Sequence, residues 1–238
     1  MRHIKKLTIL LILILNSCSN NDDSESELTG PIRLKSVVIT STDMNNSVNV
    51  RTRNFFYNTD GKLDKIETID NSQNISYINY NYSNGKLTSL TRTDGSFIET
   101  YSYTNELITS SDTYNSSGNI AFTKVYEYDS NGRVTQSDTG VGSPILFTYS
   151  GNNVITIGSE FGTTFYYEYD TKENPDKTVY PIELQKIDLI GSNNVITISN
   201  SSSSSTSNTT YNYNSLNYPT TSNTNNGSVV VDYEYEEY

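Results

Sequence analysis

The sequence predicts an all-β fold, a meander of antiparallel hairpins that forms one large curved sheet with little helix. Tyrosine and phenylalanine alternate with small polar residues over much of the chain, as in strands with one buried face and one wet face. Turn signals such as Asn-Gly separate these alternating runs. No long segment after residue 30 shows the period of an amphipathic helix. The pattern leaves open whether the sheet rolls into a barrel.

The N-terminus has the features of a secretion signal. A basic start with Arg2, Lys5 and Lys6 precedes an apolar run at 7–15, which is too short to span a bilayer. The run ends in Leu-Asn-Ser-Cys, which resembles the lipobox of bacterial lipoproteins. The resemblance implies a signal peptide at 1–17 and lipidation of Cys18, the only cysteine. Several acyl chains would anchor the protein to a membrane without spanning it. An ordinary signal peptide with an incidental cysteine is the alternative.

A polar, acidic stretch follows at 18–30 and contains Asp22, Asp23, Glu25 and Glu27. Such a stretch cannot bury apolar area, so we expect a flexible tether. It also resembles the acidic export signal of Bacteroidota surface lipoproteins, which implies display on the outer face of the outer membrane. A plain solvated linker is the alternative. The remainder, 31–238, contains no Pro/Gly-rich linker and is predicted to be a single domain.

Composition argues against several kinds of function. Loss of residues 1–17 removes three basic residues and changes the formal net charge from −11 to −14, which disfavours nucleic acid as a partner. The sequence after residue 17 contains neither histidine nor tryptophan. Ser-His-Asp and Cys-His catalysis need an imidazole, and zinc sites draw mainly on His and Cys. We therefore expect a protein that is not an enzyme and uses no metal or cofactor.

A short motif recurs along the chain: Tyr-x-Tyr, a turn, a basic residue and an aliphatic residue. In the hairpin at 80–87, a two-residue Asn-Gly turn would place Tyr82 opposite Leu87. At 55–63 and 126–134, a three-residue loop with a left-handed glycine would restore the same pairing. Cross-strand pairs of this kind contribute roughly 0.2–1 kcal/mol each. The predicted aliphatic positions are Leu63, Leu87, Leu107, Val134 and Val154.

The rest of the chain extends this pattern. Runs at 165–169 and 229–235 carry one aromatic or apolar face, and a short turn of helix is expected within 180–190. The serine- and threonine-rich stretch at 201–210 is expected to be a loop. Three apolar residues are expected on the mostly polar face, namely Phe56, Ile66 and Tyr166. Three acidic residues are expected on the polar face and at the end of an edge strand, namely Glu234, Glu236 and Glu237.

The motif Tyr-x-Tyr-(Asp/Asn)-x-x-Gly-(Lys/Arg)-(Leu/Val) resembles the YD repeat of Rhs-type proteins, which wind hairpins into a spiral sheet. More narrowly, the C-terminal half is similar to a family of uncharacterised Bacteroidota surface lipoproteins, with matching stretches at 167–175, 192–195, 211–220 and 232–235. The chain has too few repeats for a closed Rhs shell and no toxin domain, so encapsulation is not implied. A porphyrin-type ligand is associated with some family members, but no matched motif here carries a ligand residue.

The tyrosines are the candidate binding residues. Most are needed to fill the core, but some could line a groove for a glycan, a peptide or a flat aromatic ligand. Without histidine, tight ligation of haem iron is not expected. The stretches at 58–61 and 129–132 resemble calcium loops, but turn formation explains their residues without a metal. The candidate binding face comprises Tyr80, Tyr82, Tyr101, Tyr103, Tyr126, Tyr128, Tyr167 and Tyr169.

The sequence therefore favours a non-enzymatic, lipid-anchored outer-membrane protein that acts as a binding or interaction module. One alternative is a carrier of a small hydrophobic or planar ligand, porphyrin-like or glycan, on a concave tyrosine-lined face. The other is a hydrolase that uses carboxyl groups alone. The expected partners are the membrane, through the lipid anchor, and either an outer-membrane protein or a small ligand.

Overall fold

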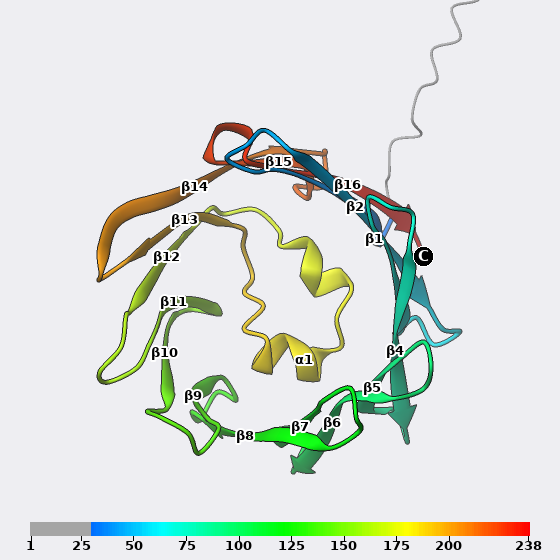
Figure 1. The fold of residues 1–238 in the computed structure, drawn as a ribbon, viewed down its shortest axis with the longest axis vertical. Coiled ribbons are helices and arrows are strands. Elements are labelled where there is room, and N and C mark those ends of the chain that lie inside the picture. Colours follow the sequence, from blue (N-terminus) through cyan, green and yellow to red (C-terminus); the bar gives the residue numbers. More distant parts are fainter. Residues whose placement is uncertain (1–29) are drawn as a thin grey trace, which may run out of the picture.

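The computed structural model describes residues 30–238, which form a closed antiparallel β-barrel (Figure 1). Cys18, the signal peptide and most of the tether lie outside the described residues. Each strand pairs with its neighbours in sequence, and β1 pairs with β16 to close the ring. The predicted all-β meander is confirmed. The strands are β1 (Ile32–Thr42), β2 (Val48–Tyr57), β3 (Leu63–Ile69), β4 (Ile75–Ser83), β5 (Lys86–Arg92), β6 (Phe97–Thr104), β7 (Leu107–Tyr114), β8 (Ile120–Tyr128), β9 (Val134–Asp138), β10 (Ile145–Ser150), β11 (Asn153–Gly158), β12 (Phe165–Tyr169), β13 (Val195–Asn200), β14 (Ser203–Tyr213), β15 (Pro219–Thr224) and β16 (Val229–Glu237).

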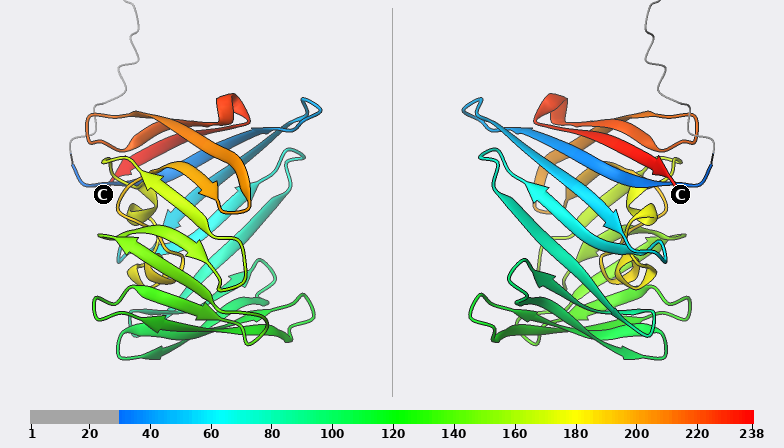
Figure 2. Two further views of the ribbon diagram at one scale, coloured as in Figure 1. Left: turned by 90° about the vertical axis from the view of Figure 1, so that its left-hand side faces the viewer. Right: turned by 90° about the vertical axis from the view of Figure 1, so that its right-hand side faces the viewer.

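One long insert separates β12 from β13, and we call residues 170–194 the plug. It holds the 3₁₀-helix η1 (Pro175–Thr178) and the helix α1 (Ile182–Ile187), which falls inside the predicted helical turn. A second 3₁₀ turn, η2 (Asn225–Gly227), joins β15 to β16. Figure 1 shows the plug inside the ring of strands. Figure 2 shows it toward the end of the barrel where β1 begins and β16 ends, which we call the plug end.

The hairpins of the repeat have the predicted register and carry a β-bulge. Tyr82 opposes Leu87 while Asn81 opposes Ser89, so β5 has one extra residue at this point. The same pairing with a bulge joins Tyr57 to Leu63, Tyr128 to Val134 and Tyr149 to Val154. The two glycines expected to be left-handed, Gly61 and Gly132, have φ of 75° and 73°.

The third repeat differs from the prediction in its aliphatic position. Tyr103 opposes Ile108, and Leu107 opposes Thr104. The turn here has only two residues, Asn105 and Glu106, both with positive φ. This turn has the same length as the Asn84-Gly85 turn, so Ile108 occupies the inward position that Leu87 has there, and Leu107 occupies the position of Lys86.

The bulges also explain a second difference. Ile66 was expected on the polar face, but it lies in the core opposite Phe55. The bulge after Leu63 shifts the alternation by one residue and turns Ile66 inward. Phe56 and Tyr166 are exposed, as predicted for the outer face.

Two further expectations about strands were wrong. The serine-rich stretch forms most of β14. It pairs with β13 on one side and β15 on the other, and this pairing offsets the low strand propensity of its residues. β16 is not an edge strand, since it pairs with both β15 and β1. Its outward acidic residues meet basic residues of β1, with Arg33 Nε 2.7 Å from Glu236 Oε1 and Lys35 Nζ 2.6 Å from Glu234 Oε1.

Candidate functional site

The plug fills the barrel from the plug end. Val179 and Leu184 are buried in one cluster with inward side chains of the wall, including Leu34, Tyr80 and Ile108. Burying a side chain of this size contributes roughly 1.5–3 kcal/mol. The core of the barrel therefore lies at the plug end, between the plug and the inward side chains of the surrounding strands.

Hydrogen bonds fix both ends of the plug. Asp170 Oδ1 accepts from the backbone N–H groups of Lys172 and Asn194, and Asp170 Oδ2 accepts from the Tyr213 hydroxyl. At the C-terminal end of the plug, the Asn153 side chain also accepts from backbone N–H groups at 192 and 193. The Leu34 N–H donates to the Thr178 hydroxyl at 3.1 Å. These hydrogen bonds attach the plug to the strands of the wall.

The inward tyrosines of the repeat form a hydrogen-bonded belt around the barrel. One tyrosine of each hairpin, usually the second, donates its hydroxyl to the carbonyl of the bulged aliphatic residue in the preceding hairpin. Eight such bonds of 2.6–2.9 Å occur within residues 30–238, and they run around the whole ring. They join Tyr57 to Leu34, Tyr82 to Leu63, Tyr103 to Leu87, Tyr128 to Ile108, Tyr149 to Val134, Tyr169 to Val154, Tyr211 to Val195 and Tyr235 to Pro219.

The basic residue of the motif completes the contact between repeats. It lies over the face of the next repeat's belt tyrosine, as Lys62 does over Tyr82 at 5.3 Å and Arg133 over Tyr149 at 4.8 Å. Such cation–π contacts contribute about 0.5–1 kcal/mol at exposed sites. The conspicuous tyrosines therefore have a structural task at the plug end.

The eight candidate tyrosines all point into the barrel, but they divide by depth. Tyr80, Tyr101 and Tyr126 are buried beneath the plug. Tyr167 lies on the inner face of β12 opposite Ile198, and burial raises its pKa. The other four, Tyr82, Tyr103, Tyr128 and Tyr169, belong to the belt, with their hydroxyls engaged.

Beyond the plug, the inner wall includes apolar side chains that are open to solvent. We call the space inside this part of the barrel the lumen. Phe122, Ile145 and Phe165 lie on the same strand faces as the buried Tyr126, Phe147 and half-buried Tyr167, so they point inward. They nevertheless keep exposed fractions of 41%, 38% and 40%. Sequence reasoning missed this wall, because alternation alone does not show which inward residues the plug leaves uncovered.

The plug brings two carboxyl groups into the barrel. Burial raises the pKa of Asp176, and the positive charge of Arg53 partly offsets this rise. Asp188 keeps contact with solvent, yet the barrel surrounds it. Removal of bulk water, followed by the negative charge of Glu99, raises its pKa to about 6, against the lowering effect of Lys124. Nothing in the sequence marked these two aspartates, since both resemble ordinary turn residues.

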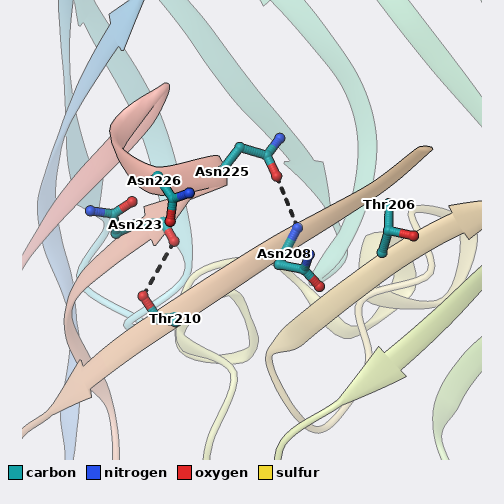
Figure 3. Close-up of a pocket in the computed structure, with 6 residues that line it drawn as sticks. All are labelled: Thr206, Asn208, Thr210, Asn223, Asn225 and Asn226. Atoms are coloured by element: carbon teal, nitrogen blue, oxygen red, sulfur yellow. Dashed lines mark hydrogen bonds between the residues drawn. The ribbon is translucent and has the colours of Figure 1, made fainter.

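Other hollows lie outside the lumen. Figure 3 shows one of about 380 Å³ on the outer face of β14 and β15, lined by threonine and asparagine. There the Asn208 N–H donates to Asn225 Oδ1 at 3.0 Å, and no ionisable side chain lines the hollow. A second, of about 230 Å³ beside the plug, is lined by Arg133, Lys177, Lys186 and the exposed Ile182.

The turns that resembled calcium loops are held by their own side chains. Asn58 Oδ1 accepts from the N–H groups of Asp60 and Lys62, and Asp129 Oδ1 accepts from those of Asn131 and Arg133. Within residues 30–238, no three acidic, histidine or cysteine side chains gather closely enough to hold a metal ion. In the same part of the chain, no helix has the length and hydropathy needed to cross a membrane.

Comparisons with known proteins concern the fold. No protein-family model matches the chain, and no curated protein matches its sequence. A solved structure of a porin-like protein from Bacteroides uniformis matches with a TM-score of 0.60 and 15% identity, over 87% of this chain and 100% of that chain. The TcdB2-TccC3-TEV structure matches with a TM-score of 0.36 and 12% identity, over 83% of this chain and 11% of that chain, which is too weak to carry an argument. The chain is therefore similar in fold to a porin-like barrel.

Proposed function

We propose that the protein is a non-enzymatic, outer-membrane-associated lipoprotein whose lumen binds a small ligand with an apolar or planar surface. The observation that carries the proposal is the apolar inner wall at Phe122, Ile145 and Phe165, which points inward but stays exposed. Concave apolar surface that the core leaves uncovered is typical of ligand sites. The closed ring of residues 30–238 also offers a protein partner no free strand edge to pair with.

The outer face of the barrel supports anchoring by lipid rather than by the wall. A barrel that crosses a bilayer carries an outward apolar band about 25 Å tall. Here the outward positions of β14 include Thr206, Asn208 and Thr210, and those of β16 include Asp232 and Glu234. In this proposal the barrel stands in water, held through Cys18. The described chain begins at the plug end, so the tether joins the barrel there.

The belt supports the resemblance to YD-repeat lipoproteins as part of the same proposal. Each element of the motif has a contact with the next repeat, as the tyrosine hydroxyl and the basic side chain of Lys62 illustrate. Because these contacts join one repeat to the next, the tyrosine and the basic residue are needed in each repeat, whatever the length of its turn.

The proposal is tested by a tryptophan reporter, since the chain contains no tryptophan. Phe165→Trp places the reporter in the lumen, and Tyr166→Trp places it on the outer face of the same strand. We expect bromonaphthalene to quench the lumen reporter saturably and the outer reporter only in proportion to its concentration. Equal, unsaturable quenching of both reporters would reject a lumen site.

A carboxyl-only hydrolase is the second candidate. The specific observation that favours it is Asp188, whose pKa is raised to about 6, mainly by burial and then by the charge of Glu99. A carboxyl group with a raised pKa near a second carboxyl group is the arrangement that glycoside hydrolysis requires. Turnover of an aryl glycoside that disappears in both Asp188→Asn and Glu99→Gln would support it, and no turnover by the wild type would end it.

A further inference from the structure

The plug aspartates are unusual because they lack protein partners. Neither the Asp176 nor the Asp188 carboxylate makes a hydrogen bond or a close ion pair with residues 30–238. By solvent-accessible surface Asp176 is half-buried and Asp188 is exposed, although burial is the main cause of the raised pKa of both carboxyl groups. Enclosing an unpartnered carboxylate costs free energy. The fold keeps two of them close enough for the charge of Asp176 to act on Asp188.

Tyrosines of the wall lie close to Asp188. Ile187 and Leu189, the residues on either side of it, pack in the same cluster as Tyr80, Tyr101 and Tyr126 of β4, β6 and β8. Burial is the main cause of the raised pKa of these three tyrosines, and the charge of Asp188 adds to it. The same charge also acts on Tyr180 of the plug itself, whose pKa is raised to about 12, mainly by burial. Aromatic faces and a carboxylate together are the groups that hold an organic cation, through cation–π attraction and direct charge pairing.

The apolar wall continues from this point. Phe122, Lys124 and Tyr126 are successive inward residues of β8, so Phe122 lies about 13 Å along the strand from Tyr126. Ile145 lies beside the same tyrosine across one strand, through its pairing with Ser137. A molecule with its charge at Asp188 would therefore lay an apolar group toward the mouth of the lumen.

We propose that the ligand of the lumen is an organic cation, an amine or quaternary ammonium group joined to an apolar body, with Asp188 as its counter-ion. This inference rests on the proposed lumen site and names the class of ligand. The groups that face Asp188 are Glu99 of β6, Lys124 of β8, Asp176 of the plug and the four tyrosines. Glu99 and Asp176 add to the attraction for a cation, while Lys124 opposes it.

The test is calorimetric titration of the full-length lipoprotein with phenyltrimethylammonium and with its neutral isostere tert-butylbenzene. We expect the cation to bind the wild type, and Asp188→Asn to weaken it at least about tenfold, or about 1.4 kcal/mol. Asp188→Glu should restore most of the affinity. Asp232→Asn, an outward carboxylate on β16, should leave it unchanged. Affinity for the cation should also fall as the pH drops below about 6.

The two probes separate this inference from the proposed function. If tert-butylbenzene binds and the cation does not, or if the cation binds Asp188→Asn as well as the wild type, the cation site is wrong and the lumen site stands. If neither probe binds the wild type, with its urea unfolding curve showing that it is folded, both ideas fail.

Discussion

At the residue scale, the repeat is explained by contacts between hairpins rather than within them. The turn residues allowed the pairing of Tyr82 with Leu87 to be predicted from the sequence. The hydroxyl bond from Tyr103 to the Leu87 carbonyl could not be predicted, because it joins different hairpins and depends on the bulge that turns this carbonyl toward the tyrosine. Each tyrosine thereby connects two repeats.

Removal of one belt hydroxyl should destabilise the barrel. Tyr103→Phe leaves the Leu87 carbonyl without its partner, and we expect a loss of about 1–2 kcal/mol in the free energy of unfolding. Tyr166→Phe removes an outward hydroxyl and should change it by less than about 0.5 kcal/mol. Urea unfolding measures both variants, and equal values would mean that the belt contributes nothing.

Asp188 should make the stability of the protein depend on pH. Its pKa is raised from 3.8 to about 6, so the folded chain holds this proton in a range where the unfolded chain has lost it. The contribution of this group to stability therefore falls as the pH rises from about 4 to about 6. Asp188→Asn should be more stable than the wild type near pH 7, with the difference vanishing near pH 3. A less stable variant near pH 7 would show that Asp188 is a structural group.

At the element scale, the plug was only partly predictable. The helical turn within 180–190 was found from its apolar spacing, and α1 lies there. The position of α1 inside the barrel depends on where β12 and β13 lie in the closed sheet. The pairing of strands far apart in sequence decides that position. β14 shows the same limit, since its serines carry little strand propensity and neighbouring strands decide their conformation.

Burial on α1 gives a matched pair of variants. Leu184 is 2% exposed in the core, whereas Ile182, two residues away, is 61% exposed. Leu184→Ala should lower the free energy of unfolding by about 2–5 kcal/mol through the cavity that it leaves. Ile182→Ala should change it by less than about 0.5 kcal/mol. Thermal and urea unfolding would contradict the docked plug if the two variants behaved alike.

At the scale of the whole molecule, closure of the sheet creates the lumen. The sequence predicted a curved meander but could not decide closure, because the pairing of β1 with β16 joins residues at opposite ends of the chain, such as Ile39 and Val231. Closure depends jointly on strand number, tilt and stagger, and no single hairpin encodes these. The candidate tyrosines were found by composition, whereas the exposed wall and the plug aspartates emerge only when the ring is complete.

The central claim is that the lumen holds a small ligand, and native mass spectrometry of the lipoprotein gently extracted from its own membranes tests it most directly. The wild type should carry an additional small-molecule mass beyond its lipids, and Asp188→Asn should lose that mass while Asp232→Asn keeps it. A wild-type protein that carries lipids alone would contradict the lumen site, whereas an additional mass that persists in Asp188→Asn would contradict only the role of Asp188 as counter-ion.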